Sequence, residues 1–200
     1  RHVSVNEEWN GASWTEVTDL PTTKAGGSGA GIITAGLVMC GTNPGNTKTT
    51  FEYDGTNWTD GGDSNSFHSD GGYISAGTQT AGLIVGGGPG PTANCELYNG
   101  TGWTETANLN TAATQGGGGG TQTSAIAGMS QQAPISKTES WDGTSWSELA
   151  DISTGRYAGG GCAANNTSAV INSGYISPNT WPTGTEEWNV VATAETVAFD

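Results

Sequence analysis

Short apolar runs recur along this chain at nearly constant spacing. They are AGLVMCG at 35–41, AGLIVGG at 81–87, SAIAGMS at 124–130 and SAVINSG at 168–174. After each of the first three comes a segment with two aromatic residues around Asn-Gly or Asp-Gly, such as ELYNGTGWTE at 96–105. Short apolar runs bounded by glycine are typical of buried β-strands rather than helices. The pattern therefore predicts an all-β protein built from one repeated unit.

The aromatic residues define the period of this repeat. The first aromatic falls at Trp9, Tyr53, Tyr98, Trp141 and Trp188, and the second at Trp14, Trp58, Trp103 and Trp146. Successive copies are 43 to 47 residues apart, a period that is typical of solenoids or propellers. In the second full unit we expect four strands, near 71–77, 80–86, 93–98 and 102–106. Asn99-Gly100 tolerates the positive φ of a tight hairpin turn between the last two.

The recurring aromatics are expected to join neighbouring sheets. A single four-stranded sheet cannot bury enough apolar surface to be stable alone, whereas stacked sheets can. Each large aromatic covers roughly 150–250 Å² when buried. A platform for stacking sugars is the alternative interpretation of these rings. An acid follows each second aromatic by two residues, and an unpaired buried carboxylate is costly, so we expect these acids at a solvated rim. They are Glu16, Asp60, Glu105 and Glu148.

The repeat resembles the Kelch repeat over nearly the whole chain. The segment LIVGGGPGPTANCELYNGTGW at 83–103 has the apolar strand, the double glycine, the Tyr and the Trp in Kelch order. ISTGRYAGGG at 152–161 resembles the family's entry to the first strand through Arg156. Only Gly86-Gly87 keeps the double glycine after the second strand, and the period is shorter than the Kelch value of about 50. The resemblance implies a Kelch-like β-propeller of four-stranded antiparallel blades, about 44 residues each.

The repeat boundaries divide one domain, 1–200, into successive units. These are a half blade at about 1–22, followed by 23–66, 67–111, 112–154 and 155–200, with 190–199 as a candidate last strand. We expect five blades. One alternative is a four-bladed ring in which strands near 157–172 pair with the N-terminal hairpin. The other is a larger ring, if N-terminal sequence is missing.

Charge and cysteine content narrow the function classes. The formal net charge of −14 repels nucleic acid and acidic membrane surfaces, so neither is an expected partner. The longest apolar stretch, 31–41, is too short and too rich in glycine to insert into a bilayer. Cys40, Cys95 and Cys162 lack any C-x-x-C spacing, which predicts buried free thiols rather than a disulfide framework.

A second resemblance bears on function. The Thr-, Asn- and Gly-rich copies, such as NGTGWTETANLNTA at 99–112, are similar to Kelch-like repeat proteins in virions of tailed bacteriophages. This implies a non-enzymatic viral structural protein of a tail fibre, head fibre or other surface appendage. It would bind a host-surface glycan for host attachment, or other virion proteins, including copies of itself as a homo-oligomer in a fibre. The alternative is a cellular Kelch-type protein-interaction scaffold in the cytoplasm.

Candidate ligand-binding residues lie in loops that differ between repeats, because loops on a rigid scaffold usually carry recognition. They are Asn43, Asn46, His68, Gln131, Gln132 and Asn179. We predict no catalytic residues, no cofactor and no metal. His2 and His68 are the only histidines, and Arg1 and Arg156 the only arginines, which is too few for the ligand or substrate clusters of known propeller enzymes.

The position of Trp103 between two sheets can be tested by mutation. Replacing Trp103 with Ala removes a large buried ring and is expected to lower the free energy of unfolding by about 3–5 kcal/mol. Chemical denaturation measures this change. An unaltered unfolding curve would contradict the placement of Trp103 between blades.

Overall fold

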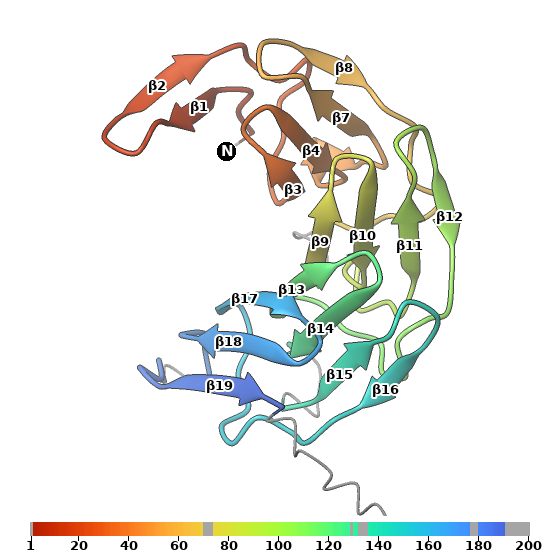
Figure 1. The fold of residues 1–200 in the computed structure, drawn as a ribbon, viewed down its shortest axis with the longest axis vertical. Helices are drawn as coiled ribbons and strands as arrows, with labels where there is room; N and C mark the ends of the chain where they lie inside the picture. The colour runs from red at the N-terminus through yellow and green to blue at the C-terminus, as the bar shows by residue number, and fades with distance from the viewer. Residues whose placement is uncertain (1, 70–73, 129, 132–135, 177–179, 191–200) are drawn as a thin grey trace, which may run out of the picture.

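The computed structural model describes residues 2–69, 74–128, 130–131, 136–176 and 180–190. These residues form successive small antiparallel sheets that follow one another around a common axis, in an arc that is open on one side (Figure 1). The predicted all-β propeller architecture is therefore confirmed. In the described part of the chain, no helix has the length and apolar character needed to cross a membrane.

The sheets follow the repeat. The N-terminal sheet pairs β1 (Asn6–Trp9) with β2 (Trp14–Val17). The next has β3 (Ser28–Ile32), β4 (Ala35–Met39), β7 (Thr50–Tyr53) and β8 (Trp58–Asp60), with a small β5 (Thr42–Asn43) and β6 (Gly45–Asn46) hairpin in its loop. The third sheet has β9 (Ile74–Thr78), β10 (Ala81–Val85), β11 (Cys95–Tyr98) and β12 (Trp103–Glu105). The fourth has β13 (Gly117–Thr121), β14 (Ser124–Gly128), β15 (Thr138–Trp141) and β16 (Trp146–Glu148). The last described sheet contains β17 (Gly160–Asn165), β18 (Ser168–Asn172) and β19 (Thr185–Asn189).

Each Asn-Gly or Asp-Gly pair makes the predicted turn between the third and fourth strands. Asn99 Oδ1 accepts hydrogen bonds from the backbone N–H groups of Thr101 and Gly102, both at 3.0 Å. Gly100 has φ +90°, in the left-handed region that glycine adopts without strain. The turn places the two aromatics opposite each other, with ring centroids of Tyr98 and Trp103 4.9 Å apart.

These aromatic pairs pack against the preceding blade. The Tyr98 hydroxyl donates to Glu52 Oε1 of the blade before it at 2.6 Å, and Trp103 Nε1 donates to Thr50 Oγ1 at 2.9 Å. Five of the nine aromatics are buried: Tyr53, Tyr98, Trp103, Trp141 and Trp146. The acids of the expected rim, Glu16, Asp60, Glu105 and Glu148, are exposed as predicted.

The N-terminal pair departs from this prediction. Trp9 is 44% exposed and Trp14 is 64% exposed. Since each pair packs on the preceding blade, and no described blade precedes β1 and β2, these two rings have no blade to cover them. Trp58 and Trp188 are half-buried.

Two other expectations are corrected. In this structure β18 pairs with β19, so the strands near 157–172 do not pair with the N-terminal hairpin as the four-bladed alternative required. Cys40 and Cys95 are buried free thiols, but Cys162 is exposed because no described blade follows β17 to cover it, whereas Ala76, at the equivalent position of β9, is buried.

The inner strands of the blades approach one another closely around the axis. β3, β9, β13 and β17 are the first strands of their sheets and pack side by side (Figure 1). A Cβ at Gly161 would lie 2.5 Å from the backbone N of Gly118 on the neighbouring inner strand. Glycine at this position is therefore required by the distance between blades.

Gly161→Ala tests this close approach. The added methyl must push β17 away from β13, and we expect a loss of about 1–3 kcal/mol of unfolding free energy, measured by thermal or chemical denaturation. Gly102→Ala is the matched control, because a Cβ there meets nothing within 4 Å. Equal stability of the two variants would show that the inner strands can separate freely.

Candidate functional site

The candidate site is the face of the propeller on which the second-to-third and fourth-to-first strand loops emerge. In an antiparallel meander these loops share one end of every blade, together with the start of each inner strand. The described loops between the second and third strands span 40–49 and 86–94, and those between blades include 61–69 and 106–116. This end of the blades therefore gathers the segments that vary most between repeats.

The predicted loop residues take different positions on this face. Asn43 lies in β5, where its Oδ1 accepts a hydrogen bond from Thr23 Oγ1 at 3.1 Å, and Asn46 is exposed in β6. Gln131 is exposed, and its backbone N–H donates to Thr114 O at 3.1 Å. Gln132 and Asn179 lie outside the described residues. The structure thus places Asn46 and Gln131 where a ligand can reach them.

His68 differs from the other loop residues because it is fully buried. Its Nδ1 lies 2.6 Å from the carbonyl oxygen of Gly86, and its Nε2 lies 3.1 Å from Glu96 Oε1. Both ring nitrogens are therefore occupied inside the protein. His68 anchors the linker that joins two blades and is not available at the surface.

Glu96 is the centre of this anchor. Its carboxylate accepts hydrogen bonds from the backbone N–H groups of Asn65 and Ser66, both at 2.7 Å, in addition to the contact with His68. Burial by itself raises the pKa of Glu96, but the hydrogen bonds from His68, Asn65 and Ser66 outweigh it and hold the pKa below the ordinary value of 4.5. The carboxylate of one blade therefore holds the linker that leads into it.

The same arrangement repeats in the next two blades. Glu139 accepts from the backbone N–H groups of Asn110 at 2.9 Å and Thr111 at 3.0 Å. Glu186 accepts from the N–H of Ser153 at 2.6 Å and lies 3.0 Å from Arg156, which is itself buried. In the sequence, a glutamate two residues before the first aromatic marks each of these three positions.

Lys24 lies in the linker that leads into β3, as His68 lies in the linker that leads into β9. Its Nζ donates to Cys40 O at 2.8 Å and to Thr49 Oγ1 at 2.6 Å. Burial lowers the pKa of Lys24, and the nearby Cys40 and Asp63 oppose that shift. Three buried basic side chains each hold a linker between blades: Lys24, His68 and Arg156. They therefore hold the loop face in place from inside the protein.

A glycine-lined pocket of about 410 Å³ lies where the inner strands begin, at the centre of this face. Seven of its nine lining residues are glycines, and the other two are Ile74 and Ser75. The Ser75 hydroxyl donates to the carbonyl of Gly29 at 2.9 Å, which joins two inner strands at the wall of the pocket. With so few side chains, the wall offers mainly backbone N–H and C=O groups. Such a wall suits a neutral ligand rich in hydroxyl groups.

Charged side chains are absent from the described lining of this pocket, which is made of glycine, Ile74 and Ser75. Within the described ranges, no group of three or more His, Cys, Asp or Glu residues is placed to hold a metal ion. The chemistry available at the pocket is therefore hydrogen bonding by the backbone.

Comparison with known proteins agrees with the fold. No protein-family model matches the chain, and no curated protein matches it. Among solved structures, the one titled "Structure of YjhT" is similar, with a TM-score of 0.74 and 15% sequence identity over 93% of this chain and 73% of that chain. At this identity the likeness shows the fold alone: an all-β propeller of small antiparallel four-stranded sheets, as in YjhT.

The anchor at Glu96 predicts a pH dependence of stability. Because the pKa of Glu96 is lowered in the folded protein, its contribution is fully present above 4.5 and is lost as the pH falls through the lower, folded-state value. Glu96→Gln should cost about 2–3 kcal/mol at pH 7 and reduce the fall in melting temperature between pH 5 and pH 3. Glu105→Gln, at an exposed residue of β12, is the control. A Glu96→Gln variant as acid-sensitive as the parent protein would argue against the anchor.

Proposed function

We propose that this propeller is a non-enzymatic binding module that takes a host-surface glycan on its loop face, as part of a surface appendage of a bacteriophage virion. The glycine-lined pocket carries the proposal. Its backbone donors and acceptors match the hydroxyl groups of a sugar, and exposed Asn46 and Gln131 on the same face add side-chain amides. The virion setting rests on the resemblance of the Thr-, Asn- and Gly-rich repeats to phage proteins.

The structural roles of the histidine, arginine and lysine side chains support binding rather than catalysis. His68, Arg156 and Lys24 are buried and each holds a linker between blades. His2 contacts Thr42 Oγ1 at 3.1 Å. These groups are used to hold the fold, and the pocket itself is lined by glycine.

A second candidate function is contact with a neighbouring virion protein. Large apolar side chains are exposed near the N-terminal hairpin: Trp9, Trp14, Ile32 and Ile33. Exposed apolar residues gathered in one region favour a protein interface. The same surface would serve a homo-oligomer in a fibre or, in the cellular alternative, a cytoplasmic interaction scaffold.

A glycan array probed with the full chain tests the main proposal. We expect binding to a restricted set of neutral or weakly charged glycans, since the net charge of −14 disfavours strongly acidic ones. Gly29→Val should weaken binding by about tenfold or more, because it narrows the pocket. A Cβ at Gly29 meets only the Leu37 carbonyl oxygen, at 3.4 Å, so the fold should tolerate the change.

Gly102→Val, in a turn at the outer edge of its blade, is the matched control and should bind as the parent does. Absence of binding to any glycan would reject the glycan proposal. Binding that survives Gly29→Val unchanged would move the site away from the pocket.

A further inference from the structure

The packing of the fourth-strand tryptophans points to a second site, distinct from the glycine-lined pocket. Trp103, the first residue of β12, donates its indole N–H to Thr50 Oγ1 at 2.9 Å. Thr50 is the first residue of β7, the third strand of the preceding blade. A fourth-strand indole and a threonine hydroxyl of the neighbouring blade therefore form a pair in this propeller.

Thr138 occupies the same position in the next-to-last described blade, at the start of β15. Thr138 is 3% exposed, and its Oγ1 is buried without a hydrogen-bond partner among the described residues. The matching tryptophan would come from a fourth strand beside β19, which pairs on one side only in the described chain. The position five residues after Trp188, where the repeat has tryptophan, is Thr193. The hydroxyl of Thr138 thus lacks the indole that its equivalent receives.

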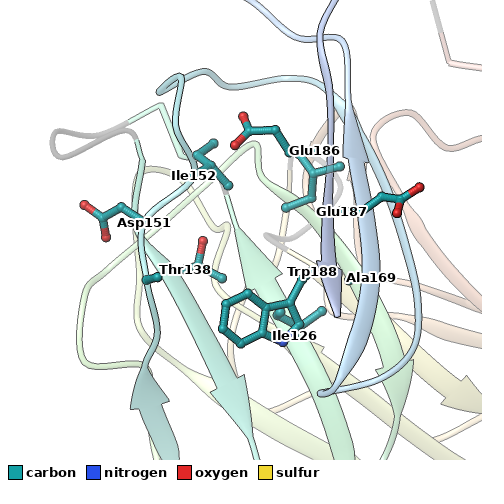
Figure 2. A pocket seen from close by; sticks show the side chains of 10 residues that line it. Ile126, Thr138, Asp151, Ile152, Ala169, Glu186, Glu187 and Trp188 are labelled. Atoms are coloured by element: carbon teal, nitrogen blue, oxygen red, sulfur yellow. The ribbon is translucent and has the colours of Figure 1, made fainter. Parts of the chain in front are cut away.

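A cavity of about 90 Å³ lies at this place, between β15 and β19 (Figure 2). Its apolar wall includes Ile126, Ile152 and Trp188, and Thr138 also lines it. Asp151 also lines it, but its carboxylate accepts a hydrogen bond from Ser136 Oγ at 3.1 Å and lies 4.0 Å from Lys137 Nζ. The cavity combines an apolar floor with one buried acceptor.

We propose that this cavity binds the indole ring of a tryptophan from a positively charged, extended strand of another protein. The strand would pair with the edge of β19 that carries no strand among the described residues, and the indole N–H would donate to Thr138 Oγ1, as Trp103 donates to Thr50. Addition of a strand to an open sheet edge is an established mode of peptide recognition. The net charge of −14 favours lysine or arginine beside the tryptophan.

A second copy of this chain fits the cavity less well. Each copy has a net charge of −14, so two copies repel one another. The exposed Trp14 of such a copy lies on β2. A fourth strand joins its blade through its inner edge, and that edge of β2 is already paired with β1.

The experiment titrates the full chain with two acetylated, amidated peptides, Lys-Trp-Thr-Lys and Lys-Ala-Thr-Lys, by calorimetry or NMR. The tryptophan peptide should bind at least about tenfold more tightly than its alanine counterpart. Indole should bind about fivefold more tightly than N-methylindole, which has no N–H to donate. Thr138→Val should abolish the difference between the two indoles while leaving the protein folded, because it removes a hydroxyl that has no partner.

Thr104→Val, at an exposed residue of β12, is the matched control and should leave all four affinities unchanged. Equal binding of the two peptides, or an indole preference that persists in Thr138→Val, would overturn the proposal. No binding of either peptide at millimolar concentration would also overturn it. Self-association of the protein that the tryptophan peptide reverses would assign the site to a second copy instead.

Discussion

The packing of each blade's aromatic pair against the preceding blade is the contact on which the rest of this structure depends. A blade of this size cannot bury its own faces, so its stability comes from its neighbours. Tyr98 and Trp103 show how this is achieved, since each ring is buried and each polar tip bonds to the blade before it. The aromatics thus combine apolar burial with hydrogen bonds that define the register between sheets.

The buried glutamates extend this coupling to the loops. Glu96 and Glu139 bind backbone N–H groups of the linkers that enter their blades. A carboxylate in this position is stable only because several donors surround it. The loop face is therefore held from inside by the same blade-to-blade contacts that hold the ring, and the glycine-lined pocket at its centre keeps its width.

Directional packing also explains why the two ends of the described arc differ. Because aromatics point to the preceding blade, the two ends of the arc are unequal. At one end Trp9 and Trp14 are exposed, and no described blade covers them. The other end leaves Thr138 without the indole that Thr50 receives. Both features follow from one interaction that is complete in the middle of the arc and incomplete at its ends.

The sequence by itself determined the class of fold, because the period of the aromatics, the Asn-Gly turns and the apolar runs are local and repeat in phase. It also placed the rim acids at Glu16 and its equivalents, since strand alternation is a local property. Only the tertiary structure decided the role of His68, whose ring meets Glu96 from 28 residues away. It likewise decided the exposure of Trp14 and the opening of the glycine-lined pocket. These features depend on which blades are neighbours in space, and a local sequence pattern does not contain that information.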